Sequence, residues 1–360
     1  MSWLLAFLGF AVLIILHEAG HFAAAKAVGM RVERFSLFFG KPLARWRRGE
    51  TEYTIGTLPL GGYVRITGMN PREEFADDVA HRAYYRQPVW KRIVVISAGP
   101  TVNVLLAFAI IWVLLLANGV AVVSHRVDAS GLQAPAARYL QPGDRVVSVD
   151  GVDGSPQAIA RAVQRHRCAG APRDGCVATT SAHVVVVREG RRLAFEIRPR
   201  YDATPGIERT RLGFSYVPAS RAVGPLDAAG RSASAMWWVT KRTVSVFVRL
   251  FDAQERKQVG SVVGGYEATR RSIESDTTRA FEILALISLS LAIINLFPFL
   301  PLDGGHIFWA LAEKVRGRAI PFSVMERASA VGFVLVVMVF LIGLSNDIGR
   351  LQDGTFDRLR

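Results

Sequence analysis

The chain has 360 residues, of which 51% are hydrophobic and 21% are charged, and its formal net charge is +14. This apolar content excludes an ordinary soluble protein, and the charged fraction excludes a chain that lies wholly within a bilayer. No basic helix or aromatic-interleaved repeat supports nucleic-acid binding, so we assign the basic excess to loops beside an anionic lipid bilayer. The composition therefore predicts an α-helical polytopic membrane protein with at least one water-exposed domain.

Four apolar segments are each long enough to cross a hydrocarbon core of roughly 30 Å as a helix. We expect one transmembrane helix from each, and we expect the polar stretches between them to form loops or domains. The four segments lie at residues 3–27, 93–123, 281–311 and 323–345.

The basic residues around these segments set their orientation. No Lys or Arg precedes the first segment, whereas seven lie between residues 26 and 48. Because basic loops stay in the cytoplasm, the N-terminus is predicted to lie outside and the loop at 28–92 inside. The link at 312–322 is also basic, which places it inside and leaves 124–280 and the tail outside. We expect a multi-pass protein of the inner or plasma membrane.

The first segment contains the sequence His17-Glu18-Ala19-Gly20-His21. Positions i and i+4 share a face of a helix, so the two imidazoles can bind one metal ion. Glu18 lies beside them and is placed to take a proton from a bound water. Ionisable residues are costly in a bilayer and mark functional sites there. The helical rise puts His17 about 20 Å from the outer surface, nearer the cytoplasmic face.

Two histidines leave a catalytic metal one protein ligand short, and Asp303 in the third segment is the best candidate. Pro298 and Pro301 break the helix before it, and Gly304 after it allows close backbone approach. Broken helices are tolerated at membrane depth where they are buried or line a cavity. This segment runs inward, so Asp303 falls at the depth of His17. The alternative is a proline-kinked span in which Asp303 merely begins the cytoplasmic loop.

These motifs together resemble the site-2 proteases, which are intramembrane zinc metalloproteases. The His-Glu-x-x-His motif, the Ala98-Gly99-Pro100 sequence with Asn103, and Asn295 through the Leu-Asp-Gly-Gly at 302–305 occur in the family's order, across nearly the whole chain. The second proline stands at Pro301, one position later than in many members, which leaves the local helix break open.

The resemblance implies a role for each site residue. It makes His17, His21 and Asp303 the ligands of Zn²⁺, with Glu18 as the catalytic base. It also places Asn295 near the active site, where it would hold the substrate or the developing oxyanion; the alternative is an interhelical hydrogen bond. His306 lies three residues after Asp303 and is a further candidate ligand. We expect it to be structural or supporting, because the family pattern gives the ligand role to Asp303.

Bacterial members of this family cut membrane-tethered anti-sigma factors and similar single-span proteins. The resemblance therefore implies an endopeptidase whose partner is a single-pass membrane protein, shortened first by another protease outside. Two alternatives belong to other classes. A metal transporter would need ligands at several depths, and no inverted repeat is visible. A catalytically idle scaffold would have no need of Glu18.

Two polar segments have recognisable local structure. Residues 31–66 have strand character with a turn at 48–50, and their edge could pair with an unwound substrate or simply form a small structural sheet. In the outer segment, the sequence LQPGDRVVSVDG at 140–151, a helix at 155–166 and a strand at 183–187 resemble a PDZ domain. An access filter over the membrane site is the expected role of this domain, and an inert spacer is the alternative.

Two further features of the outer region each allow two interpretations. Cys168 and Cys176 lie in an apparent insertion at 167–182, where they form either a disulfide or two free thiols. Residues 225–257 predict an amphipathic helix, which lies on the membrane surface or packs on the PDZ-like domain.

The predicted fold is a polytopic protein of about four transmembrane helices with an inserted α+β PDZ-like domain. Its parts are a first membrane half (1–124), the PDZ-like domain (125–200), an amphipathic and linker region (201–280), a second membrane half (281–345) and a tail (346–360).

Overall fold

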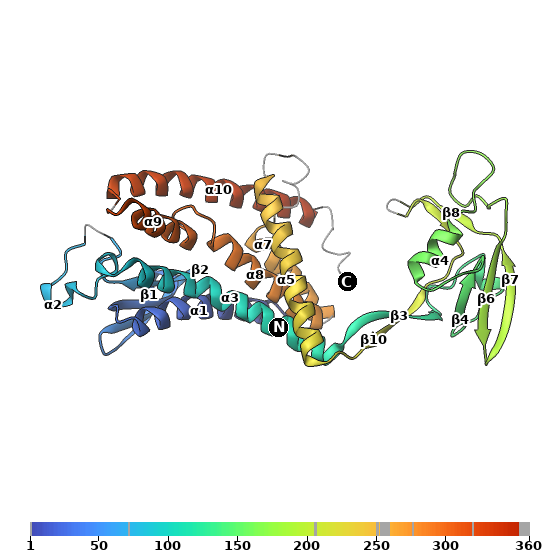
Figure 1. Cartoon of the computed structure of the whole chain (residues 1–360), viewed down its shortest axis with the longest axis horizontal. Coiled ribbons are helices and arrows are strands. Elements are labelled where there is room, and N and C mark those ends of the chain that lie inside the picture. Colours follow the sequence, from blue (N-terminus) through green and yellow to red (C-terminus); the bar gives the residue numbers. More distant parts are fainter. Residues whose placement is uncertain are drawn as a thin grey trace. The chain divides into compact units, whose positions relative to one another are not determined.

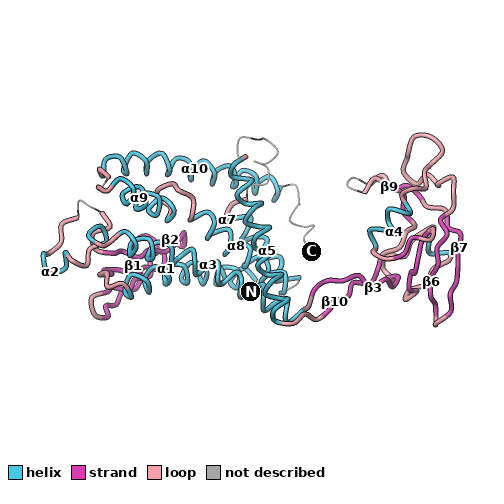
Figure 2. The backbone as a smooth tube through the Cα atoms, viewed as in Figure 1, coloured by secondary structure: helices cyan, strands magenta, loops and turns pink. Residues whose placement is uncertain are grey.

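The computed structural model describes residues 2–70, 73–204, 207–249, 252, 260–275, 277–318 and 320–352. The chain forms two compact units. The first unit combines Met1–Leu116 with Gly224–Arg360 and is mainly helical, and the second, Ala117–Val223, is mainly strands (Figures 1 and 2).

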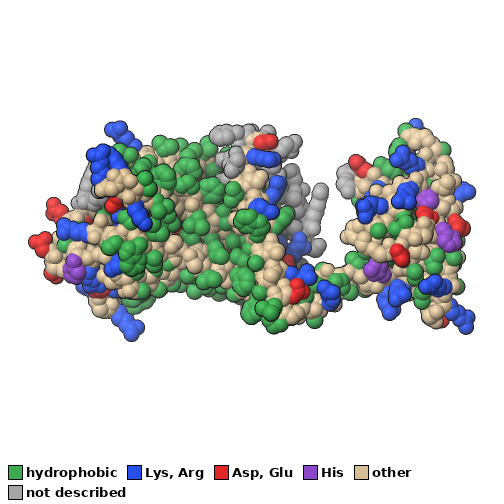
Figure 3. All heavy atoms as spheres, in the orientation of Figure 1, with side chains coloured by type: hydrophobic (Ala, Val, Ile, Leu, Met, Phe, Trp, Pro, Cys, Tyr) green, Lys and Arg blue, Asp and Glu red, His purple; other side chains and the backbone are tan. Residues whose placement is uncertain are grey.

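Within the described part of the chain, four helices are long and apolar enough to cross a membrane, as the composition predicted. Figure 3 shows hydrophobic side chains covering much of the visible face of this unit. Such a surface is stable against lipid rather than water. The four helices are α1 (Ser2–Ala27), α3 (Val89–Asn118), α8 (Thr277–Asn295) and α10 (Phe322–Gln352).

The second span ends earlier than predicted. Helix α3 stops at Asn118, and Gly119 follows with φ of +72°, a left-handed conformation that favours glycine. The chain then enters strand β3 (Val120–Val127) of the second unit. The predicted extension of the span to residue 123 was wrong, because Val120 to Val123 are apolar strand residues rather than lipid-facing helix.

The third apolar segment, at 281–311, contains two helices rather than one. Helix α8 ends at Asn295, and α9 (Asp303–Arg316) begins as a separate helix after a non-helical link. The break itself was predicted correctly from Pro298 and Pro301, since proline lacks the N–H that a helix interior needs. The displaced proline at Pro301 is therefore compatible with the break.

Two glycines, Gly304 and Gly332, allow the link at 296–302 to lie close to its neighbours. A Cβ atom on Gly304 would lie 2.2 Å from the carbonyl oxygen of Leu296, so no larger residue fits there without movement. On α10, a Cβ atom on Gly332 would lie 1.8 Å from the carbonyl oxygen of Leu300. The link is thus held between the start of α9 and the backbone of α10.

The amphipathic segment forms helix α5 (Pro225–Val248), which packs on the membrane helices. Met236 is buried in one cluster with Ala107 of α3 and Leu289 of α8, whereas Trp237 is exposed. Packing on α3 and α8 was not among the two positions expected for this helix.

The region expected to be a linker contains a further helix, α7 (Val262–Ser275). Asp347 of α10 is fully buried and accepts hydrogen bonds from the backbone N–H groups of Ser261 (2.6 Å) and Gly264 (3.0 Å). These bonds satisfy donors at the first turn of α7, where a carboxylate is favoured by the helix dipole.

The loop after α1 forms a long antiparallel hairpin, as its strand pattern predicted. Strands β1 (Val32–Arg48) and β2 (Thr51–Ile66) pair in antiparallel register around a turn at Gly49. A short helix, α2 (Asp77–Ala80), follows the hairpin. At the turn, Glu50 accepts hydrogen bonds from Arg82 (2.7 and 2.8 Å) and Lys26 (2.5 Å). The hairpin is therefore tied to the end of α1 and to the segment before α3.

The second unit is an α+β fold built on one antiparallel sheet. The sheet has the order β10-β3-β4-β6-β7, with β5 paired to β4, and β8 pairs separately with β9. Side chains of β6 alternate between buried and exposed, which gives the core Val184 and Val186. The remaining strands are β4 (Arg145–Val149), β5 (Val152–Asp153), β7 (Arg191–Ile197), β8 (Arg200–Asp202), β9 (Arg209–Arg211) and β10 (Tyr216–Arg221).

The predicted helix and strand of this unit are both present. Helix α4 (Pro156–Val163) begins after Ser155, whose hydroxyl accepts a hydrogen bond from the N–H of Ala158 at 3.2 Å. Strand β6 covers Ala182–Arg188. Cys168 and Cys176 form a disulfide, which decides between the two alternatives for this pair. The PDZ identity of the unit stays a prediction.

The charged cluster at the hairpin turn generates a pH prediction. The hydrogen bonds from Arg82 lower the pKa of Glu50 from its ordinary 4.5 to about 2. The contribution of this carboxylate to stability is therefore present above about pH 4.5 and is lost as the pH falls through about 2. We expect Glu50→Gln to lower the midpoint of thermal unfolding by roughly 2 °C at neutral pH, because about one-third-exposed ion pairs contribute little.

The same variant should approach the wild-type midpoint as the pH is lowered from about 4.5 toward 2, in thermal scans of detergent-purified protein. Glu74→Gln is the matched control, since Glu74 is exposed in the same loop. An equal destabilisation at both ends of the pH range would contradict the ion-pair explanation.

Candidate metal centre

Two histidines lie on one buried face of α1. His17 and His21 are one helical turn apart, both are buried, and their ring centroids are 4.9 Å apart. Their Nε2 atoms approach to 3.3 Å. On this face the missing Cβ atom of Gly20 lets α1 approach the α3 backbone closely, and both rings are buried inside the protein.

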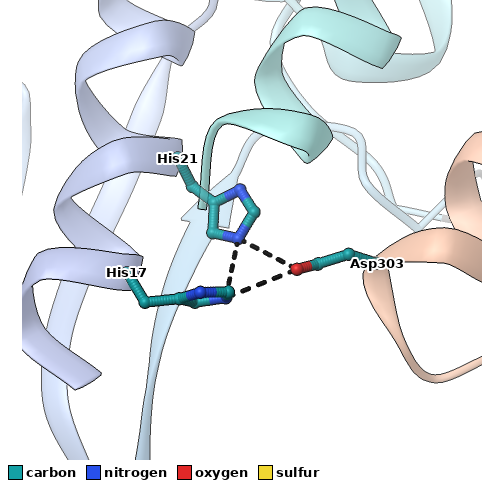
Figure 4. A group of neighbouring side chains, drawn as sticks. All are labelled: His17, His21 and Asp303. Atoms are coloured by element: carbon teal, nitrogen blue, oxygen red, sulfur yellow. Dashed lines mark hydrogen bonds and ion pairs between the residues drawn. The ribbon is translucent and has the colours of Figure 1, made fainter. Parts of the chain in front are cut away.

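Asp303 reaches the two histidines from a distant part of the chain. It is the first residue of α9, and its Oδ2 atom lies 3.3 Å from the Nε2 atom of each ring (Figure 4). The link after α8 determines this position, because it turns the chain back before α9 begins. The juxtaposition predicted from equal membrane depth is thus what the structure shows.

The three side chains fit a zinc ion by their chemistry and by their arrangement. One ligand atom from each lies within 4.8 Å of the others. Oδ2 of Asp303 is buried and has no hydrogen-bond donor in bonding geometry among the described residues. Two imidazole nitrogens and a carboxylate oxygen form a catalytic zinc set that leaves one position for water.

Helix α3 fits closely against this group. The backbone carbonyl of Val95 accepts a hydrogen bond from Nδ1 of His21 at 2.8 Å. A Cβ atom on Gly99 would lie 2.3 Å from Nε2 of the same ring, and one on Gly20 would lie 2.8 Å from the carbonyl oxygen of Ala98. The glycine of the Ala-Gly-Pro motif on α3 is therefore required for steric reasons, because a larger residue there would displace His21.

The other predicted site residues lie around the three ligand candidates. Asn295 ends α8, and its Nδ2 atom is 3.3 Å from Nε2 of His17. A Cβ atom on Gly62 of β2 would lie 2.9 Å from Cγ of Glu18, so the hairpin passes directly beside the proposed base. His306 does not belong to the group of converging ligand atoms found in the described part of the chain.

The sequence analysis did not predict two side-chain contacts that support the site. Asn103 of α3 lies with its Nδ2 atom 3.1 Å from Nδ1 of His17, although its sequence motif gave it no role. Arg92 of α3 makes two hydrogen bonds to Glu313 of α9, at 2.9 and 2.7 Å, and is only 3% exposed. A lone arginine before an apolar segment hinted at the second contact, but its partner is 221 positions away.

A sequence-family model described as Peptidase family M50 matches residues 5–339. The chain belongs to peptidase family M50. Zinc metalloprotease Rip1 of Mycobacterium tuberculosis is 32% identical over 372 residues, which cover 91% of this chain and 91% of Rip1. A candidate zinc metalloprotease of Synechocystis sp. is 34% identical over 349 residues, covering 92% of this chain and 91% of the relative. A similarly named Campylobacter jejuni protein is 28% identical and covers 94% and 91%.

Family membership confirms the resemblance predicted from the motifs. This M50 peptidase is a zinc metalloprotease, and its four apolar helices indicate an integral membrane protein. Among the described residues, His17, His21 and Asp303 form a group whose ligand atoms converge closely enough to hold a metal ion. The family therefore accounts for costly polar residues inside otherwise apolar helices.

The Arg92–Glu313 pair generates a test of how α9 is held. Breaking a buried ion pair leaves an uncompensated charge and costs up to about 3 kcal/mol. We expect Arg92→Glu and Glu313→Arg each to lower the midpoint of thermal unfolding and the zinc content, because α9 carries Asp303. The double exchange should recover most of both losses.

The exposed pair of Arg231 and Asp227 on α5 supplies a matched control, since its side chains are 44% and 50% exposed. Exchanging that pair should change the unfolding midpoint very little. If the Arg92–Glu313 double exchange were no better than the single variants, a positional role for the pair would be refuted.

Proposed function

We propose that this M50 peptidase is an intramembrane zinc endopeptidase that cleaves a single-span membrane protein, such as an anti-sigma factor. The observation that carries the proposal is the convergence of His17, His21 and Asp303 among helices long enough to span a membrane. A buried metal site is useful for hydrolysis there only if the scissile bond reaches the same depth.

In this proposal, His17, His21 and Asp303 hold the zinc ion through the three atoms that converge. When bound, zinc polarises the scissile carbonyl and makes water a better nucleophile at neutral pH. Glu18 is adjacent to His17 on α1 and takes the proton from the attacking water. It then passes this proton to the leaving amine, as a general base and acid in turn.

Asn295 supports the same reaction from the end of α8. Its amide lies beside His17, and an N–H from this amide can stabilise negative charge on the substrate oxygen. The position of this amide beside His17, where α8 ends, supports the proposed role. The interhelical hydrogen bond expected as the alternative is compatible with this position.

The hairpin is proposed to present the substrate. A helical substrate hides its peptide bonds, so it must be extended before cleavage. Strand β2 passes beside Glu18 at Gly62, which is where an extended segment would meet the base. Pairing of the substrate with a strand edge would hold the segment open through main-chain hydrogen bonds.

The membrane orientation is part of the proposal. Basic residues after α1 support a cytoplasmic hairpin, with the N-terminus and the second unit outside. The second unit would then restrict access to the membrane site as a PDZ-like filter. Its disulfide supports an oxidising surrounding. Clustering of the ligands at one site favours proteolysis over transport, and family membership favours it over an idle scaffold.

The proposal predicts that Glu18→Gln abolishes cleavage while zinc stays bound. Glutamine keeps the size of the side chain but cannot accept the proton, so the rate should fall by at least about 100-fold. Zinc content is measured by atomic spectroscopy on purified protein, and cleavage by comparing membrane-protein fragments between wild-type and variant cells.

His17→Ala is the companion variant and should lose both zinc and cleavage. Cleavage by Glu18→Gln at the wild-type rate would refute the assignment of Glu18 as the base. Wild-type protein that contains no zinc and produces no fragments would instead favour the idle scaffold.

A further inference from the structure

Asn103 is a buried amide with one unsatisfied end. It is fully buried on α3, and its Nδ2 atom lies 3.1 Å from Nδ1 of His17. Its Oδ1 atom is buried without a hydrogen-bond partner among the described residues. A buried carbonyl left without a donor costs about 1–3 kcal/mol, so an amide at this position calls for an explanation.

The metal-binding chemistry of His17 explains why an amide lies at this position. A neutral imidazole that offers the lone pair of Nε2 to a metal carries its proton on Nδ1. The group beside Nδ1 must then accept a hydrogen bond, which an amide NH₂ cannot do and an amide oxygen can. A half turn of the Asn103 amide exchanges two ends of nearly equal size and brings the orphaned oxygen to Nδ1.

His21 shows the same arrangement without ambiguity. Its Nδ1 atom lies 2.8 Å from the carbonyl oxygen of Val95, which can only accept. His21 therefore carries a proton on Nδ1, and in the neutral ring this leaves the Nε2 lone pair, on the side of Asp303, available to a metal ion. Helix α3 thus already sets the tautomer of one ring, and Asn103 lies two turns further along the same helix.

The backbone of Asn103 is also fixed. The hydroxyl group of Ser288 on α8 donates a hydrogen bond to the Asn103 carbonyl oxygen at 2.9 Å, and both residues are fully buried. This contact joins α3 to α8 at the level of the site. The side chain of Asn103 consequently projects from a backbone position that two helices define.

We propose that Asn103 is a positioning residue for the metal site, whose amide oxygen accepts the Nδ1 hydrogen of His17 and so keeps Nε2 free to bind zinc. The inference rests on the proposed ligand role of His17. Side chains that orient a ligating histidine in this way typically change metal affinity by about 10–100-fold when they are removed.

The test is the zinc affinity of the full-length protein in detergent, measured by competition with a chelator. An ionised carboxylate accepts a hydrogen bond but cannot donate one. We expect Asn103→Asp to bind zinc within about threefold of wild type, and Asn103→Leu to bind it about 10–100-fold more weakly. Thr101→Val, at an exposed position on the same helix, is the matched control and should match wild type.

Each outcome either supports or overturns the positioning role of Asn103. Weak binding by Asn103→Asp would show that the amide N–H is what His17 needs, and would overturn the inference. Wild-type affinity in Asn103→Leu would overturn it as well. If Asn103→Leu fails to fold, the aspartate variant alone decides. Absence of zinc binding by wild type would instead refute the metal role of His17, which separates the two failures.

Discussion

The close approach of α1 and α3 at Gly20 and Gly99 is the contact on which the candidate metal centre depends. At Gly20 and Gly99 neither helix has a Cβ atom, and a methyl group on either would meet the other helix at less than 3 Å. This lets the imidazole of His21 occupy space beside the α3 backbone, where Val95 accepts its hydrogen bond. The apolar surroundings strengthen such bonds and make unpaired groups costly. The tight packing of α1 on α3 and the orientation of the His21 ring therefore depend on each other.

The second half of the site depends on a different piece of backbone. Asp303 approaches the histidines only because α8 ends at Asn295 and a new helix begins after the link. Glycines at both sides of this link allow backbone atoms to touch, and Arg92 ties the far part of α9 back to α3. Protein covers part of this irregular backbone, since Leu300 is buried, whereas Leu296 and Phe299 are 46% and 45% exposed.

The sequence predicted those features that local rules control. The histidine pair, the proline break before Asp303 and the turn at Gly49 each depend on a few neighbouring residues. The length of the apolar segments located the four helices that could span a membrane. Contacts between distant segments could not be predicted in this way. The bond between Arg92 and Glu313, the cap on α7 from Asp347 and the contact of Asn103 with His17 all join separate helices. The end of α3 was missed because Val120 and its neighbours are apolar in either a helix or a strand.

Gly332 shows how unevenly this architecture tolerates change. Most of α10 is exposed on the protein surface, and in a bilayer such positions accept almost any apolar side chain. Gly332 is different, because the carbonyl oxygen of Leu300 occupies the space that a side chain would need. A helix whose exposed positions tolerate many apolar side chains thus has a strict steric requirement at Gly332. The requirement comes from the link that positions Asp303 at the start of the neighbouring helix α9.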